Sequence, residues 1–83
     1  MNKEIRKKAL ETRVTIQIGK NGITPTLIAE IKKQLVHKKI IKIRILKAAL
    51  DEKDKKEIAK QIAAETKAEQ SNLTGLILTL KRR

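Results

Sequence analysis

The sequence predicts a two-layer α/β domain in which helices cover one face of a four-stranded mixed sheet. Three features predict it. Two strand-like stretches alternate apolar and polar residues, each precedes a stretch with helical periodicity, and two short strand-like stretches meet at a glycine near the end of the chain. Strand–helix–strand units require parallel pairing with right-handed crossovers, and the closing hairpin adds an antiparallel strand. The expected order is helix, strand, helix, strand, helix, strand, strand, within a single domain comprising residues 1–83.

The first elements are a short helix over residues 2–12 and a strand over residues 13–18. Asn2 can cap the helix, and three basic residues share its outer side. The strand is rich in β-branched residues and alternates with a period of two, which is typical of a half-buried strand. We expect Val14, Ile16 and Ile18 to point inward and Arg13, Thr15 and Gln17 to point outward.

A second helix is predicted after residues 19–22 break the chain. Thr24 can serve as its N-cap, and Pro25 suits the first helical position because the N–H that proline lacks would have no helical partner there. The buried stripe of this helix comprises Leu27, Ile28, Ile31 and Leu35, and its exposed side carries Glu30, Lys33 and His37.

A second strand is predicted over residues 40–47, with Ile41, Ile43 and Ile45 on the face that the helices cover. The opposite face of the sheet then carries polar and basic residues together with apolar residues that need cover, which the first helix could supply. This outer face comprises Arg13, Thr15, Gln17, Lys42 and Arg44, with Ile40, Leu46 and Ile77.

A third helix is predicted from Asp51, with Asp54 at the acidic position of a capping box. Its lysines have acidic partners one turn away, so this helix is expected to be locally neutral. Residues 70–74 and 76–82 then form a hairpin around Gly75. The inner face of the helix comprises Ile58, Ala59, Ile62, Ala63 and Thr66.

Positive charge is concentrated in the first half of the chain. The whole chain has 21 Lys and Arg against nine Asp and Glu, a formal net charge of +12. Residues 1–47 carry 13 basic and three acidic side chains, a net +10, whereas residues 48–80 carry five basic and six acidic ones, a net −1. One strongly basic surface beside a neutral one favours a nucleic-acid partner over a charge that only keeps the protein soluble.

The composition argues against several classes of site. The chain has no cysteine, no aromatic residue and one histidine, so we expect no metal, no cofactor, no nucleophilic catalysis and no base stacking on aromatic rings. We therefore predict a protein that is not an enzyme and takes no small-molecule substrate. The sequence has no signal-peptide or membrane-spanning apolar stretch, so no membrane is expected and the expected location is the cytoplasm.

The loop Gly19-Lys20-Asn21-Gly22 joins a strand to the start of a helix. Such a junction exposes several backbone N–H groups at the positive end of the helix, glycine lets a phosphodiester approach closely, and Lys20 adds a charge. KH domains clamp RNA backbone with a loop of this type. The alternative is a plain turn whose glycines only relieve backbone strain. With the loop, one phosphate-tracking surface is predicted to comprise Lys3, Arg6, Lys7, Arg13, Lys32, Lys33, Lys42 and Arg44.

Residues 14–46 resemble the CRM domain, named for chloroplast RNA splicing and ribosome maturation, whose stand-alone prokaryotic form is the YhbY-like protein. The family pattern is a strand, Gly-x-Asn-Gly, a hydrophobic residue and threonine, a helix with Ala-Glu-Ile, and a basic β-branched strand. In this chain the pattern reads Gly19-Lys20-Asn21-Gly22-Ile23-Thr24, then Ala29-Glu30-Ile31, then Ile40-Ile41-Lys42-Ile43-Arg44-Ile45.

The resemblance implies a fold similar to the C-terminal domain of translation initiation factor three. It also implies non-catalytic binding of structured RNA, with ribosomal RNA or pre-ribosomal particles of the large subunit as the expected partner. The RNA-contacting loop of the family matches Gly19, Lys20, Asn21 and Gly22. We expect phosphate contacts to supply affinity, RNA shape to supply selectivity, and the protein to be a monomer.

Two other functions stay open at this point. An Alba-type chromatin protein has a related fold and a Gly-Lys loop after its first strand, but it reaches DNA with a long hairpin arm. Here the hairpin has only Thr74 and Gly75 on which to turn. A protein-interaction subunit whose charge is incidental would instead show no salt-sensitive affinity for RNA.

Overall fold

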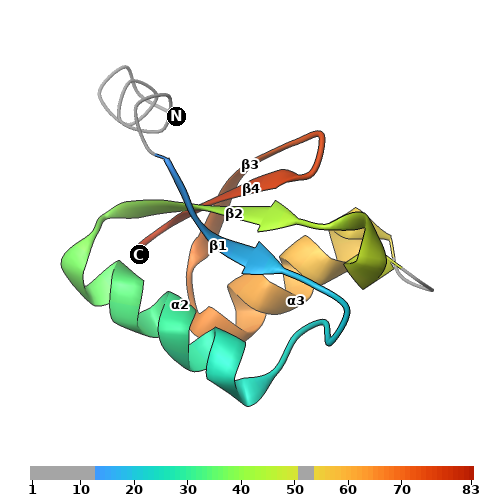
Figure 1. Cartoon of the computed structure of the whole chain (residues 1–83). Coiled ribbons are helices and arrows are strands. Elements are labelled where there is room, and N and C mark those ends of the chain that lie inside the picture. The colour runs from blue at the N-terminus through green and yellow to red at the C-terminus, as the bar shows by residue number, and fades with distance from the viewer. Residues whose placement is uncertain (1–12, 51–53) are drawn as a thin grey trace.

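A computed structural model of the chain describes residues 13–50 and 54–83. The helix predicted over residues 2–12, with Lys3, Arg6 and Lys7, lies outside the described residues, as does the helix start predicted at Asp51. The described elements are β1 (Val14–Ile18), α2 (Pro25–His37), β2 (Ile40–Ile45), the 3₁₀ helix η1 (Lys47–Leu50), α3 (Lys55–Thr66), β3 (Glu69–Thr74) and β4 (Ile77–Lys81) (Figure 1).

The four strands form one mixed sheet in the order β1-β2-β4-β3. β1 and β2 are parallel and are joined through α2, whereas β4 runs antiparallel to both of its neighbours, β2 and β3. Figure 1 shows α2 and α3 on the same face of this sheet. The predicted two-layer α/β fold with a four-stranded mixed sheet is therefore confirmed.

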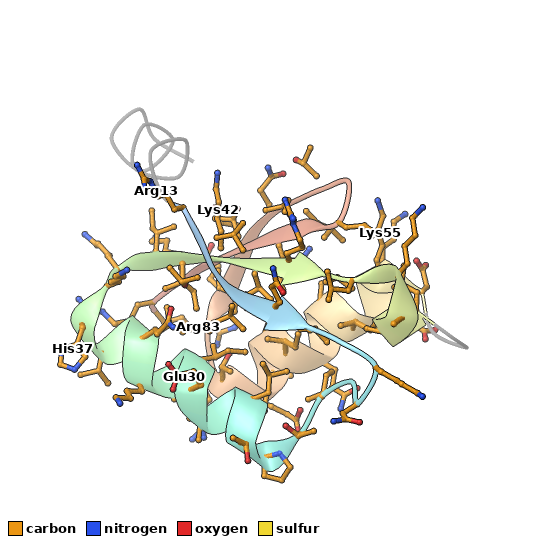
Figure 2. The ribbon with its side chains drawn as sticks, in the orientation of Figure 1. Arg13, Glu30, His37, Lys42, Lys55 and Arg83 are labelled. Carbon is orange, nitrogen blue, oxygen red and sulfur yellow. The ribbon has the colours of Figure 1, made fainter. Side chains whose placement is uncertain are left out.

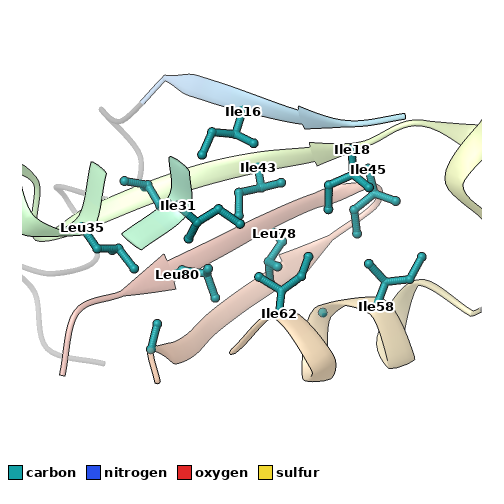
Figure 3. Close-up of a cluster of buried hydrophobic side chains, with 13 residues drawn as sticks. Ile16, Ile18, Ile31, Leu35, Ile43, Ile45, Ile58, Ile62, Leu78 and Leu80 are labelled. Carbon is teal, nitrogen blue, oxygen red and sulfur yellow. The ribbon is translucent and has the colours of Figure 1, made fainter. Parts of the chain in front are cut away.

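The core lies between the sheet and the two helices and consists of isoleucine, leucine and alanine side chains (Figure 3). Ile43 and Leu78 of the central strands are fully buried, as are Ile31 of α2 and Ile62 of α3. Burying a branched side chain of this size stabilises the fold by roughly 1.5–3 kcal/mol. The inward positions predicted for β2, α2 and α3 are confirmed.

The two helices begin at side-chain caps. The Leu27 N–H donates to Thr24 Oγ1 at 3.1 Å, and Pro25 follows Thr24 as predicted. The Lys56 N–H donates to Asp54 Oδ1 at 3.4 Å, so Asp54 is the N-cap of α3. This corrects the prediction of a helix that already includes Asp54 in a capping box, because Asp54 itself has extended backbone angles.

A bulge in β1 changes which of its residues face the helices. Val14 lies opposite Lys42 and Ile16 lies opposite Ile43, so Thr15 is the extra residue. Val14 therefore shares the outer face with Lys42, while the Thr15 hydroxyl donates to Gln34 Oε1 on α2. The prediction that Val14 points inward is wrong, and Thr15 is exposed as predicted but turns its hydroxyl toward α2, because a bulge interrupts the alternation.

The ends of β2 and the β3–β4 hairpin are set by short turns. β2 ends at Ile45 rather than at residue 47, because the chain turns into η1 at Lys47. The hairpin turns on Gly75, with φ of 57°, and Leu76, so it forms no extended arm. Lys55 Nζ donates to Gly75 O at 2.8 Å and ties this turn to the start of α3. Among the described residues, no helix is long and apolar enough to cross a membrane.

Candidate nucleic-acid interface

The loop of residues 19–22 leaves β1 and leads to α2 at one edge of the sheet (Figure 1). The Gly22 N–H donates to Gly19 O at 2.9 Å, which closes a tight turn. Gly22 has φ of 66°, a conformation that favours glycine. Gly19 has no such backbone angle, and a Cβ there would meet only Leu46 Cδ1 at 4.0 Å. Turn geometry therefore explains the glycine at position 22 but not the glycine at position 19.

Some backbone donors at the junction of β1 and α2 are absent or already used. Pro25 has no N–H, the Gly22 N–H is used within the turn, and the Leu27 N–H is used by the Thr24 cap. Among the described residues of this junction, the amides of Lys20, Asn21, Ile23, Thr24 and Thr26 make no hydrogen bond. The side chains of Lys20 and Asn21 are exposed. Several amides at this junction are thus without a partner among the described residues.

A groove with a volume of about 490 Å³ lies beside the loop, between β1 and the first half of α2. One wall is the edge strand of the sheet, the other is a helix, and the loop closes one end. Ile16 and Leu27 are the apolar side chains in its walls. The groove is lined by Thr15, Ile16 and Gln17, by residues 19–22, and by Thr24, Thr26, Leu27 and Glu30.

A chain of hydrogen bonds crosses from β1 to α2 at this groove. The Thr15 hydroxyl donates to Gln34 Oε1, and Gln34 Nε2 donates to Glu30 Oε1 at 3.3 Å. Glu30 is the one acidic residue between positions 13 and 50. Figure 2 shows Glu30 on the middle of α2. The sequence prediction placed Glu30 in solvent, and its side chain is exposed, but it also lines the groove.

Of the basic residues predicted to form one surface, those that the structure describes lie in three places. Arg13, Lys42 and Arg44 belong to the outer side of the sheet, and Figure 2 shows Arg13 and Lys42 directed away from the helices. Lys32 and Lys33 are exposed on α2, in the other layer. Lys20 lies in the loop between the layers. The structure therefore does not gather these residues on a single face, because sheet and helix charges diverge.

A second depression, with a volume of about 210 Å³, lies where the last turns of α2 and α3 meet the end of β4. Sequence reasoning singled out only Lys32 of its basic residues and missed Lys67, Arg82 and Arg83. The signal that could have found them is a cation following the end of α3 and two more after the last strand. The depression is lined by Lys32, Leu35, Val36, Thr66, Lys67, Ala68, Arg82 and Arg83.

Few acidic groups neutralise these cations. Within the described residues, the one ion pair joins Lys81 Nζ to Glu69 Oε2 at 3.6 Å, across the β3–β4 pair. That pair is partly exposed and contributes little to stability, about 0–1 kcal/mol. The same residues contain no group of His, Cys, Asp and Glu that could hold a metal ion. The interface thus offers amides, hydroxyls and cations, which suit an anionic polymer.

A family model for the CRS1/YhbY (CRM) domain matches residues 1–82 of the chain. The chain belongs to the CRM domain family. The resemblance predicted from residues 14–46 is confirmed, and the family match extends well beyond that stretch.

This CRM domain is similar to two curated proteins. One is "Probable RNA-binding protein MJ0652" of Methanocaldococcus jannaschii, with 35% identity over 82 residues, covering 99% of this chain and 60% of the relative. The other is "RNA-binding protein" of Haemophilus influenzae, with 39% identity over 67 residues, covering 81% of this chain and 66% of the relative. The chain therefore spans less than two thirds of the length of either relative.

A solved structure has the same fold. The solution structure of the hypothetical protein SAV1595 from Staphylococcus aureus matches with a TM-score of 0.78 and 30% identity. The match covers 96% of this chain and 81% of the other.

Arg82 links the end of α2 to the last strand of this CRM domain, and its loss should destabilise the fold. Its Nη1 donates to Leu35 O at 3.3 Å and to Val36 O at 3.1 Å, carbonyls that the helix end leaves without helical partners. Arg82→Ala is expected to cost about 1 kcal/mol, which lowers Tm by roughly 4–8 °C in a domain of this size. Thermal unfolding followed by circular dichroism measures the shift.

The neighbouring residue supplies the control for this prediction. Arg83 is exposed and makes no hydrogen bond or ion pair to any described residue, so Arg83→Ala removes the same charge without releasing a helix carbonyl. Equal Tm values for the two variants would contradict a capping role for Arg82.

Proposed function

We propose that this CRM domain is a non-catalytic, monomeric protein that binds structured RNA by its phosphate backbone. The loop of residues 19–22 and the groove beside it are the proposed contact region. The amides of Lys20, Asn21 and Thr26 donate to phosphate oxygens, and the Lys20 ammonium adds a charge. No chemical step is needed for this role, since binding itself is the function.

The observation that carries this proposal is Gly19. Neither a left-handed backbone nor crowding requires glycine at that position, because a Cβ would meet nothing closer than 4.0 Å. Without a side chain at position 19, the loop backbone is uncovered next to the free amides of Lys20 and Asn21. A phosphodiester can therefore come closer than a side chain would allow. A plain turn, the alternative reading of the loop, explains Gly22 only.

The comparisons support RNA as the polyanion. Both curated relatives are named as RNA-binding proteins, and the family model covers almost the whole chain. The family resemblance further points to ribosomal RNA during assembly of the large subunit, acting in the cytoplasm. The hairpin turn of Gly75 and Leu76 lacks the arm of an Alba-type protein, which makes duplex DNA the weaker candidate.

The nucleic-acid preference can be measured with matched probes. We expect this CRM domain to bind a hairpin RNA at least about tenfold more tightly than a DNA duplex of equal length at the same salt concentration. The physical reason is that the hairpin offers unpaired loop nucleotides, which proteins that bind RNA specifically mostly recognise, whereas the duplex offers none. Fluorescence anisotropy gives both dissociation constants, and equal affinity would favour the Alba-type alternative.

The RNA target is testable in cell extract. Crosslinking of the full chain followed by sequencing of the attached RNA should enrich large-subunit ribosomal RNA over total RNA. Enrichment of other RNAs in its place would contradict the ribosomal part of the proposal, while leaving RNA binding itself intact.

A further inference from the structure

Glu30 is the feature of the groove that phosphate binding does not explain. It is the one acidic residue among positions 13–50, where nine Lys and Arg side chains lie, and it lines the same groove as the loop. A carboxylate repels phosphate, so a groove that served only the RNA backbone would be better without it.

The structural role of this carboxylate is small. Glu30 lies beyond the first turn of α2, where an acidic residue would stabilise the helix end, and that first turn holds no acidic residue. Within the described part of the chain, Glu30 forms no ion pair. Its one recorded bond is the one that it accepts from Gln34 at 3.3 Å.

That bond fixes how the carboxylate is presented. Gln34 Oε1 accepts from the Thr15 hydroxyl, so the amide nitrogen of Gln34 is the atom that donates to Glu30 Oε1. The strand thereby sets the orientation of Gln34, and Gln34 sets the orientation of Glu30. Oε2 of Glu30 makes no hydrogen bond to any described residue, and Oε1 keeps a second lone pair. The groove thus holds an oriented carboxylate with acceptor capacity to spare.

We propose that Glu30 reads an unpaired guanine in the RNA. Guanine presents two adjacent donors, N1–H and N2–H, which match the two oxygens of a carboxylate in a bidentate pair. Cytosine and adenine each have a ring nitrogen that accepts hydrogen bonds beside their amino group, and the N3–H of uracil lies between two carbonyl groups. Each of these bases therefore offers the carboxylate one donor next to an acceptor that the carboxylate repels. This inference rests on the proposed function, because the loop holds the phosphate of a nucleotide next to the groove.

The remaining walls of the groove suit a base. Its volume of about 490 Å³ falls within the range of roughly 300–1,000 Å³ that is common for sites of small ligands. Ile16 and Leu27 offer apolar contact to the face of the base, in a chain that has no aromatic ring for stacking. Gln17 and Thr26 also line the groove and carry hydrogen-bond donors for the guanine O6.

A set of hairpin RNAs tests the proposal. Each carries a uridine loop with one variable nucleotide, which is guanosine, inosine, adenosine, cytidine or uridine, and binding is measured by anisotropy at fixed salt. The guanosine hairpin is expected to bind at least about fivefold more tightly than the uridine hairpin, the lower bound for a bidentate pair. The inosine hairpin lacks the N2 amino group, so it should lose most of the additional affinity that the guanosine hairpin shows. Glu30→Gln should abolish the preference for guanosine, so that the guanosine and uridine hairpins bind with equal affinity.

The matched control is Glu65→Gln. Glu65 accepts from Gln61 Nε2 at 3.4 Å on the exposed side of α3, a Gln–Glu pair at the same spacing in the reverse order, and it does not line the groove. The Glu65→Gln variant should keep the preference for guanosine. Thr15→Val removes the hydroxyl that orients Gln34 and should weaken that preference.

Two results overturn the inference. A wild-type protein that binds all five hairpins equally has no base reader, and a Glu30→Gln protein that gains the same factor on every hairpin has lost only a repulsive charge. Failure of the proposed function is distinct from both, since it appears as an absence of salt-sensitive binding to every hairpin.

Discussion

Replacing Gly19 with aspartate is expected to lower the affinity of this CRM domain for RNA by about 100-fold or more. The new carboxylate would occupy the space that we assign to a phosphate. Two like charges about 4 Å apart repel by about 4 kcal/mol at an effective dielectric of about 20, and every 1.4 kcal/mol is about tenfold in affinity. The fold should tolerate the change, because the Cβ meets only Leu46 Cδ1 at 4.0 Å. Anisotropy with a hairpin RNA at one salt concentration measures the loss.

Two control variants separate the possible causes of that loss. Gly19→Asn has nearly the size of the aspartate variant without its charge, so it should lose only what close approach contributes. Ala64→Glu adds the same charge at an exposed position of α3, where screening should keep the effect on RNA affinity small. A Gly19→Asp protein with native Tm and unchanged affinity would show that the loop is not the contact site.

The corresponding substitution at Gly22 is less informative. Its φ of 66° makes any side chain unfavourable there, so a loss of binding could follow from a loss of structure. The backbone conformation requires glycine at position 22, whereas only the proposed ligand explains glycine at position 19. Gly19 is therefore the position at which the function can be tested.

The fold could be predicted because its determinants are local. The alternation of Ile41, Ile43 and Ile45 with Lys42 and Arg44 sets the faces of β2 without reference to any other segment, and the structure agrees. In the same way, Thr24 and Pro25 specify the start of α2 through atoms within four residues. Once the elements are known, the handedness of the crossover and the closing hairpin leave few topologies.

The features that escaped prediction depend on pairing between distant segments. The bulge at Thr15 exists only in the register with β2, and it directs that hydroxyl to Gln34, 19 residues away. The same non-local bond orients Glu30, which by sequence alone is one more exposed residue of an amphipathic helix. The proposed base reader could therefore not have been recognised before the strand and the helix were placed side by side.

Charge along the sequence likewise does not specify charge on a surface. The net +10 of residues 1–47 suggested one basic face. Arg13 and Lys42 lie on the outer side of the sheet, however, and Lys32 lies beside the second depression in the helix layer. A count of charges along the chain does not tell whether each charge lies in the sheet layer or in the helix layer. An RNA that contacts all of these groups has to pass from the sheet layer to the helix layer, and the loop of residues 19–22 lies at one edge where it could do so.

Salt dependence tests how far the RNA extends around the domain. A strand bound only at the loop would meet Lys20 and release about one counterion, which gives a shallow dependence. Contact with 6–10 phosphates instead weakens binding by roughly 10³–10⁵ between 50 and 200 mM salt. We expect the steep result, because the +12 chain has cations on the outer face, in the loop and on α2. A plot of log affinity against log salt gives the number of contacts from its slope, and a flat plot would favour the protein-interaction alternative.

Single neutralised lysines then show which faces take part. Lys42→Gln on the outer face and Lys32→Gln beside the second depression should each reduce the slope by about one if the RNA reaches them. Lys60→Gln, at an exposed position of the locally neutral α3, is the matched control and should leave the slope unchanged. A slope that falls for Lys42 but not for Lys32 would place the RNA across the sheet edge and the outer face. The opposite pattern would place it along α2.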